Sequence, residues 1–203
     1  EKCGRIPEKI LDPKCAICGI PPVKKQSSHF FFKLSNFEDV LENWLKDNKF
    51  LQQDVKKYVL NWIVEGLQDW DITRDIPWGV NIPMAGNEQK DKVFYGWFDN
   101  HLCYISSLIE LLQDIDKARE KWNNSKIYHF IGKDIVYHHY LFLLAIIIDI
   151  NQEYKLPDFI PTRGHLMLQN NKISKSRNWY IGLREFVNLF QADYLRFYIG
   201  QSP

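Results

Sequence analysis

The sequence predicts an α/β fold, in which short strands alternate with helices. Between residues 93 and 199, runs rich in β-branched and aromatic residues are separated by segments whose apolar residues recur at helical spacing. Such alternation indicates parallel βαβ units and a doubly wound sheet. The 203 residues are 45% hydrophobic and 15% aromatic, which is enough for one well-buried domain, alone or with a small appendage.

The first 92 residues contain one expected strand and two expected helices. An aromatic run, HFFFKL, defines the strand, and apolar residues at helical spacing define the helices. In chain order we expect a cysteine-rich knuckle and linker (1–25), a strand (29–34), a helix (37–45), a second helix (about 52–70), an irregular segment (73–83) and a polar turn (86–92).

The remaining residues carry the alternating pattern. In chain order we expect a strand (93–98), a helix (105–112), a strand (127–131), a helix (135–150), a strand (165–168), a polar loop (169–177) and two helices (185–190 and 192–199). Ligands of doubly wound sheets bind beyond the carboxyl ends of the strands, so the informative loops follow residues 97, 131 and 168.

Composition narrows the functional classes. The net charge of +1 argues against a protein that coats nucleic acid by bulk charge. Residues 159–203 hold six Lys and Arg against two acidic residues, which suits an anionic ligand, although a solvated face has the same composition. No apolar run approaches the ~18 residues of a membrane span, so we expect no membrane partner. Three of the four cysteines lie in the first eighteen residues, unlike a disulfide framework, which indicates a reducing, cytoplasmic location.

The sharpest motif lies in the polar loop, where Lys172 and Lys175 are interleaved with Ile173, Ser174 and Ser176. Two lysines three residues apart, among hydroxyls, form a flexible cationic clamp that can neutralise the charge of a polyphosphate. The alternative interpretation is a solvated Lys/Ser turn.

The pentapeptide KISKS is similar to the KMSKS signature of class I aminoacyl-tRNA synthetases. Further segments in family order are KCAICG (14–19), HFFFKL (29–34), residues 74–83, residues 93–99 with 104–106, HFIGKDIV (129–136) and SKSRNW (174–179). Together they cover nearly the whole chain and resemble methionyl-tRNA synthetase, most closely its archaeal and eukaryotic branch. The resemblance implies the second half of a class I Rossmann-type catalytic domain with the remainder of a zinc-knuckle-bearing connective insertion.

The resemblance also implies a division of the chain. The expected regions are a partial zinc knuckle and linker (1–25), the rest of the connective insertion with helices that pack on the catalytic domain (26–90), the second Rossmann half with the KMSKS-like loop (91–178) and the start of the helical stem-contact region (179–203).

Site residues follow from the same resemblance. Those matching methionine-pocket positions are Trp97, Tyr104, Ile135 and His139. Those matching ATP-binding positions are Gly132, Asp134, Arg74, Lys172, Ser174 and Lys175, with Lys172 and Lys175 as the catalytic lysines. An aromatic, apolar cavity suits a thioether, and a carboxylate beside a glycine suits ribose hydroxyls. Without the resemblance, the aromatic residues would be read as core and the histidine as a surface imidazole.

One segment departs from the family pattern. Asn100-His101-Leu102-Cys103 stands where the family usually has Ala-Pro-Ile-Gly. Two larger polar residues should alter the shape of the methionine pocket or the stiffness of its loop. His101 and Cys103 could also be read as metal ligands or as a nucleophile, but no partner lies nearby in the sequence.

A second chemical cluster lies near the beginning of the sequence. Cys15 and Cys18 have the CxxC spacing of a zinc knuckle, and Cys3 is the third expected Zn²⁺ ligand. The family carries paired CxxC knuckles here, so the fourth ligand is expected just before Glu1. Structural thiols without a metal are the alternative.

The implied function is activation of methionine by ATP, with Mg²⁺, and its transfer to tRNA(Met). The sequence contains no HxGH tetrad, the HIGH motif of the family, and it ends before an anticodon-binding domain. We therefore expect the chain to be inactive alone and to require a complementary N-terminal half as its partner. The alternative is a non-catalytic synthetase-like module that binds tRNA or a protein.

Overall fold

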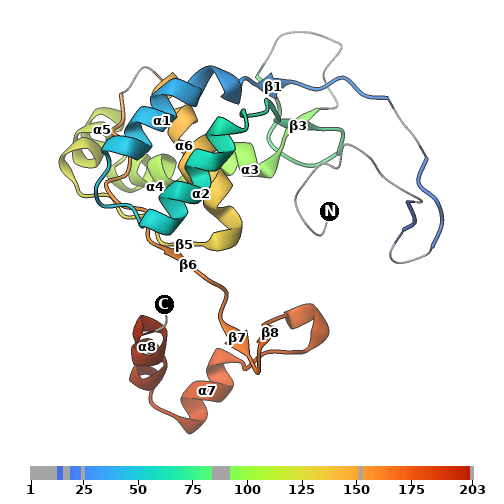
Figure 1. The fold of residues 1–203 in the computed structure, drawn as a ribbon, viewed down its shortest axis with the longest axis vertical. Helices are drawn as coiled ribbons and strands as arrows, with labels where there is room; N and C mark the ends of the chain where they lie inside the picture. Colours follow the sequence, from blue (N-terminus) through green and yellow to red (C-terminus); the bar gives the residue numbers. More distant parts are fainter. Residues whose placement is uncertain (1–12, 16–18, 24–25, 84–91, 151–152, 202–203) are drawn as a thin grey trace.

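The computed structural model describes residues 13–15, 19–23, 26–83, 92–150 and 153–201. Figure 1 shows a body that runs from β1 to β6 and a C-terminal part that runs from β7 to α8, joined by an extended segment. The candidate site is built where these two parts meet and along one side of the body.

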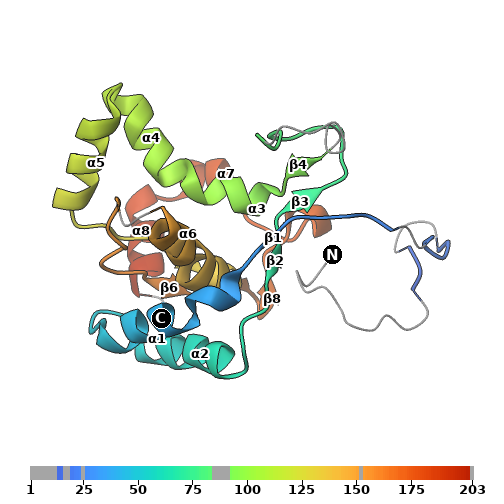
Figure 2. The ribbon, with the colours of Figure 1, turned by 90° about the horizontal axis from the view of Figure 1, so that it is seen from above.

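Helix α6 (Leu143–Asp149) forms the centre of the body. Figure 2 shows α1 (Glu38–Asp47) and α2 (Gln53–Val64) on one side of it and α4 (Cys103–Leu112) and α5 (Ile115–Asn124) on the other. Residues 140–147 are all buried, and their side chains divide between an apolar cluster with α1 and α2 and a smaller one with α4 and α5. An all-apolar helix is stable in this central position because both of its sides are covered.

The helix expected at residues 37–45 is confirmed as α1, preceded by the 3₁₀ turn η1 (Leu34–Phe37). The second expected helix was extended too far, because α2 ends at Val64 rather than near residue 70. Gly66 adopts a φ of +89°, which turns the chain out of the helix. The Leu67 N–H then donates to the Glu38 carboxylate at 2.6 Å and fixes the exit.

Two antiparallel strand pairs lie beside the helices. β1 (Phe31–Phe32) pairs with β2 (Trp70–Asp71), and β3 (Thr73–Arg74) pairs with β4 (Val93–Phe94). The strands expected at 29–34 and 93–98 are therefore both shorter than the sequence indicated. The polar turn expected at 86–92 lies outside the described residues, except for its last residue.

The chain turns into helix directly after β4. α3 (Gly96–Asp99), the 3₁₀ turn η3 (Asn100–Leu102) and α4 follow one another without a break. The segment at residues 100–103, which departs from the family pattern, thus forms helical structure. It extends the helix expected at 105–112 toward the N-terminus. This continuity places positions 97, 101 and 104, three or four residues apart, on one side of the helical segment.

The described residues contain one βαβ unit. β5 (Ile131–Gly132) leads through the 3₁₀ turn η4 (Lys133–Ile135), the π-helical turn η5 (His138–Phe142) and α6 to β6 (Thr162–Arg163). β5 and β6 are parallel, with Ile131 opposite Thr162 and an adjoining parallel bridge from Tyr128 to Phe159. The helix expected at 135–150 is confirmed as η5 and α6, whereas only Ile131 of the strand expected at 127–131 lies in β5, with a bridge at Tyr128.

The doubly wound sheet is not formed within the described residues. The strands there make four two-stranded sheets, three of them antiparallel. Sequence analysis also missed α5, whose residues are mostly polar, and β6, which follows two prolines at positions 157 and 161. Helix α5 starts because the Asp114 carboxylate accepts from the N–H groups of Asp116 and Lys117 at 3.0 Å.

The C-terminal part consists of a hairpin and two helices. β7 (Met167–Leu168) and β8 (Asn171–Lys172) form the hairpin, whose turn residues 169 and 170 have φ of +50° and +61°. α7 (Leu183–Leu189) and α8 (Ala192–Gln201) confirm the two helices expected at the end of the chain. No residue from 164 to 201 is buried.

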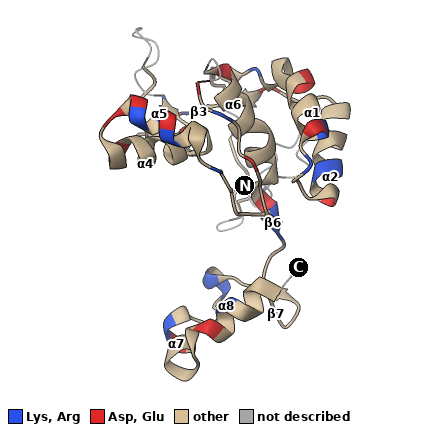
Figure 3. Ribbon diagram, turned by 90° about the vertical axis from the view of Figure 1, so that its left-hand side faces the viewer, with Lys and Arg blue, Asp and Glu red and all other residues tan. Residues whose placement is uncertain are grey.

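Basic and acidic residues are mixed along the helices of the body, as Figure 3 shows for α1 and α5, in agreement with the net charge of +1. Within the described part of the chain, no helix combines the length and the hydrophobicity needed to cross a membrane.

Candidate active site

Three of the four residues assigned to the methionine pocket form one hydrogen-bonded chain. The Tyr104 hydroxyl lies 2.9 Å from Nε2 of His139, and Nδ1 of His139 lies 3.1 Å from the Ile135 carbonyl oxygen. Because the carbonyl can only accept, Nδ1 carries the proton, and Nε2 accepts from the tyrosine hydroxyl. The fold therefore brings together residues that are far apart in the sequence and fixes the tautomer of the histidine.

His139 belongs to a group of four imidazoles, called the imidazole cluster below. Its members are His101, His129, His138 and His139. Ring centroids are 5.9 Å apart for His101 and His139, 5.9 Å for His129 and His139, and 5.5 Å for His101 and His138. Trp97, the fourth assigned pocket residue, stacks on His138 at 4.7 Å. The pocket residues and the imidazole cluster thus form one continuous aromatic surface.

Burial keeps the imidazole cluster uncharged at neutral pH. Burial and, to a smaller extent, the nearby imidazoles together lower the pKa of His101, His129 and His138 to about 4. Burial also lowers the pKa of His139, opposed by its hydrogen bond to the Ile135 carbonyl. A neutral, aromatic surface of this kind can bind an apolar side chain and still offer polar nitrogen atoms.

The segment that departs from the family pattern, residues 100–103, contributes His101 to this aromatic surface. His101 is 3% exposed, and neither of its ring nitrogens has a hydrogen bond of normal geometry in the described part of the chain. The carbonyls of Phe98 and Trp97 lie close enough to favour a proton on the ring. Cys103 is exposed, so it does not join the buried His101 in a common site. The reading of these two residues as a metal pair or nucleophile is thus without structural support.

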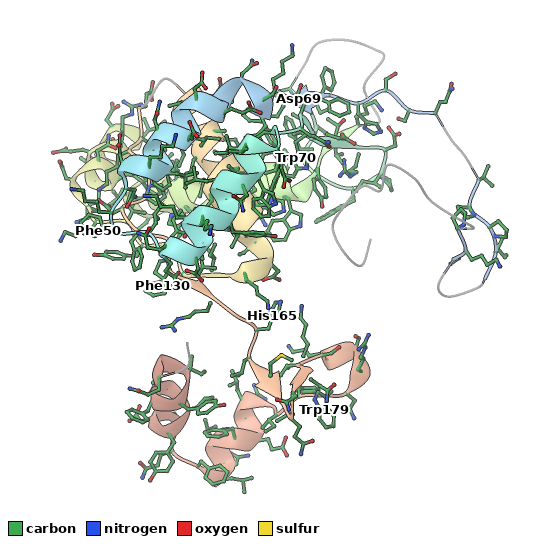
Figure 4. The ribbon with its side chains drawn as sticks, viewed as in Figure 1. Phe50, Asp69, Trp70, Phe130, His165 and Trp179 are labelled. Atoms are coloured by element: carbon green, nitrogen blue, oxygen red, sulfur yellow. The ribbon has the colours of Figure 1, made fainter. Side chains whose placement is uncertain are left out.

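The surface is open on one side. Trp97 and Tyr104 are 38% and 40% exposed, although their partners His138 and His139 are more deeply placed. Trp70, labelled in Figure 4, packs beneath the surface, with its ring centroid 5.4 Å from that of His138. The imidazole cluster therefore has a closed base and an accessible outer face.

A cleft of about 460 Å³ lies beyond the carboxyl ends of β5 and β6. The lining residues are Asp54, Val55, Tyr58, Lys133, Asp134, Val136, Thr162 and His165. This is the position at which parallel α/β sheets bind their ligands. Gly132 adjoins the cleft, and a Cβ atom at this position would lie 2.6 Å from Oδ1 of Asp134. The glycine is therefore needed for the carboxylate to occupy its place.

The KISKS residues follow the hairpin of the C-terminal part. Lys172 ends β8, and Lys175 begins the 3₁₀ turn η6 (Lys175–Arg177). Ser174 forms two backbone hydrogen bonds with Trp179, whose indole N–H donates to the Leu168 carbonyl at 3.0 Å. Figure 4 shows Trp179 beside this hairpin. The polar loop expected at 169–177 is thus an ordered hairpin and turn.

The structure places Arg74 differently from the other residues assigned to ATP. Its guanidinium forms an ion pair with Asp71 at 3.0 Å and lies 3.8 Å above the ring of Tyr95. Asp71 lies in β2 and Tyr95 directly precedes α3, and Arg74 does not line the cleft. The contacts indicate a structural role in this conformation.

The expected zinc ligands are largely outside the described residues. Cys3 and Cys18 lie there, whereas Cys15 is described and exposed. The Cys15 carbonyl accepts from Gly19 N–H at 2.9 Å. The described residues contain no group of three potential metal ligands. The zinc site therefore remains a prediction.

Several residues that the fold brings to the site could not be predicted from the sequence. His129 and His138 had no distinguishing pattern, and Trp70 was expected at the end of a helix. His101 was noticed as a departure, but its burial depends on the unbroken helical segment. His165 was expected in a strand with no role, although its place before the KISKS loop is a signal that could have drawn attention.

A cleft at the ends of parallel strands, faced by a lysine-bearing hairpin, is an arrangement of nucleotide-binding α/β proteins. Residues 1–202 match the family described as tRNA synthetases class I (M), and the chain belongs to this family. The resemblance inferred from the motifs is thereby confirmed.

Archaeal methionine–tRNA ligases are among its relatives. The chain is 42% identical to that of Methanopyrus kandleri over 207 residues, covering 98% of this chain and 30% of the relative. It is 38% identical to that of Pyrococcus furiosus over 216 residues, with the same coverage of each. The chain thus spans about a third of the length of the curated relatives it matches.

Solved structures show the same fold. Mycobacterium tuberculosis methionyl-tRNA synthetase bound by methionyl-adenylate matches with a TM-score of 0.74 and 25% identity, over 92% of this chain and 35% of that chain. The apo form of that synthetase matches with a TM-score of 0.60 and 26% identity, over 75% of this chain and 30% of that one.

Proposed function

We propose that this chain carries the methionine-binding surface and the ribose-binding cleft of a methionine–tRNA ligase. One observation carries the proposal: Asp134 of the cleft and Ile135 of the hydrogen-bonded chain are consecutive residues of η4. The two assigned subsites are therefore adjacent, as a reaction between an amino acid and a nucleotide requires. The similarity to a synthetase bound by methionyl-adenylate supports this assignment.

The proposed reaction has two steps. A carboxylate oxygen of methionine attacks the α-phosphorus of ATP, the bond to the bridging oxygen breaks, and pyrophosphate leaves with its electron pair. The methionyl group of the adenylate then passes to the terminal adenosine of tRNA(Met), and AMP leaves. No protein nucleophile takes part, so catalysis consists of positioning and charge stabilisation.

Each part of the site has a role in this reaction. The thioether lies against Trp97 and the neutral imidazole cluster, where soft, polarisable contacts favour sulfur. Asp134 accepts hydrogen bonds from ribose hydroxyls, and Gly132 leaves space for the carboxylate. Lys172 and Lys175 neutralise the charge of the phosphates, and ATP enters with Mg²⁺ bound to the phosphates themselves.

The remaining assignments belong to the same proposal. A complementary N-terminal half with the HIGH tetrad completes the ATP site, and the exposed outer faces of Trp97 and Tyr104 suit such a cover. Residues 179–203 begin the stem-contact region for tRNA, and Zn²⁺ binds the knuckle of residues 1–25. The cytoplasm is the proposed location.

Methionine-dependent pyrophosphate exchange tests the function. The chain alone should show no exchange, and exchange should appear when the complementary half of the synthetase is added. Norleucine, which replaces the sulfur by a methylene, is the matched control substrate. Absence of exchange in the complete assembly, together with retained binding of tRNA, would favour a non-catalytic module instead.

A further inference from the structure

His165 connects the cleft to the KISKS hairpin. Figure 4 shows it in the segment between the body and the C-terminal part, and it lines the cleft together with Asp134 and Thr162. Its Nε2 atom lies 3.2 Å from Nζ of Lys172, seven residues further along the chain. No other residue lines the cleft and also has a hydrogen bond to a KISKS lysine in the described part of the chain.

The chemistry of this contact fixes the state of both side chains. A lysine ammonium has three protons and can only donate, so Nε2 of His165 must accept. His165 is therefore neutral here, with its proton on Nδ1. One of the three ammonium protons is directed toward the histidine, which leaves two for other acceptors. By contrast, the Lys175 ammonium has no hydrogen-bond or ion-pair partner in the described residues.

We propose that His165 is a positioning residue that holds Lys172 at the mouth of the cleft and directs its two remaining protons toward the polyphosphate of ATP. The inference rests on the proposed function. A lysine on a flexible four-carbon stem loses conformational freedom when it binds a phosphate, and a second fixed contact reduces that cost. Because Asp134 lines the same cleft, the held ammonium lies on the side where the ribose is expected.

The contact depends on the protonation of His165. A protonated imidazole loses its acceptor and repels the ammonium 3.2 Å away. The other charged groups that line the cleft are Asp54, Lys133 and Asp134. The contact therefore requires the neutral form of His165.

The first test measures the contact itself, in the 203-residue chain. Nitrogen NMR of labelled histidine distinguishes which ring nitrogen carries the proton. We expect the Nδ1–H form of His165 at mildly alkaline pH and a shift toward the Nε2–H form in Lys172→Met. Lys175→Met is the matched control and should leave the tautomer unchanged. Equal spectra for wild type and Lys172→Met would overturn the proposal, whatever the activity of the enzyme.

The second test measures methionine activation in the complete synthetase. His165→Leu should raise the KM of ATP roughly two- to tenfold, the effect of one partly exposed hydrogen bond, and leave the KM of methionine unchanged. His165→Gln keeps a hydrogen-bond acceptor at this position, so it should restore the KM of ATP. Lys121→Gln, an exposed change in α5, should match the wild type.

The outcomes separate the two proposals. A wild-type synthetase without pyrophosphate exchange would refute the proposed function, whereas normal exchange with the same KM of ATP in wild type and His165→Leu would refute only the role of His165. A His165→Gln enzyme whose KM of ATP is as high as that of His165→Leu would also overturn that role.

Discussion

Replacing Tyr104 with Phe tests the hydrogen-bonded chain at the centre of the site. The change removes one oxygen atom and leaves Nε2 of His139, which is 3% exposed, without its donor at 2.9 Å. A buried acceptor left unsatisfied costs about 1–3 kcal/mol, and the phenyl ring can keep the packing of Tyr104 on His129, whose ring centroids are 4.3 Å apart. The decrease in the free energy of unfolding should therefore come mainly from the loss of this one hydrogen bond.

The assay is urea unfolding of the chain, followed by tryptophan fluorescence. We expect Tyr104→Phe to lower the free energy of unfolding by about 1–3 kcal/mol without changing the slope against urea. Tyr128→Phe is the control, because Tyr128 is 50% exposed and has no side-chain hydrogen bond in the described structure. A double-mutant cycle with His139→Leu isolates the pair. A coupling energy near zero would refute the hydrogen-bonded chain.

The remaining predictions concern acid, the cleft and the lysines. Acid should destabilise the fold: the pKa values of three buried imidazoles are about 4 against 6.5 for the unfolded chain, so the folded state binds fewer protons. The contribution of these imidazoles to the free energy of unfolding should be fully present above pH 6.5. It should be lost as the pH falls toward 4, by on the order of 1–3 kcal/mol for each imidazole. Urea unfolding at several pH values measures this, and a flat profile would contradict the burial of neutral histidines. Gly132→Ala should raise the KM of ATP at least severalfold in the complete synthetase, because the added Cβ would lie 2.6 Å from the Asp134 carboxylate; an unchanged KM would place the ribose elsewhere. Lys175→Ala should lower the rate of methionine activation by on the order of 10²–10³ and barely change the KM of methionine, since the loss falls on the transition state. A Lys175→Ala enzyme with the wild-type rate would show that this lysine lies in a solvated turn.

The local pattern of apolar residues predicted the helices better than it predicted the strands and their pairing. The apolar residues of α1 recur at a helical period, whereas α6 belongs to a continuous apolar run, and both helices formed where they were expected. The strands are only two residues long, and their partners are distant, as for Phe32 and Trp70 in β1 and β2. Pairing of that kind depends on tertiary packing, which no local period records.

The site residues likewise divide into those that the sequence indicated and those that depend on tertiary packing. The motifs indicated Asp134, Tyr104 and His139, because their roles follow from residue type and family position. The partners His101 and His165 depend on how separate segments meet in space. His101 becomes buried only because α3, η3 and α4 run on as continuous helical structure. His165 reaches Lys172 only because the hairpin pairs Lys172 with Met167, two residues after the histidine.

The position of η4 has a thermodynamic consequence for the proposed enzyme. Asp134 and Ile135 share one short turn, so a ligand on either residue restricts the same backbone. The second ligand then meets a turn whose ordering has already been completed and binds with a smaller entropic cost. Such coupling is reciprocal: ATP must increase the affinity for methionine by the same factor by which methionine increases the affinity for ATP.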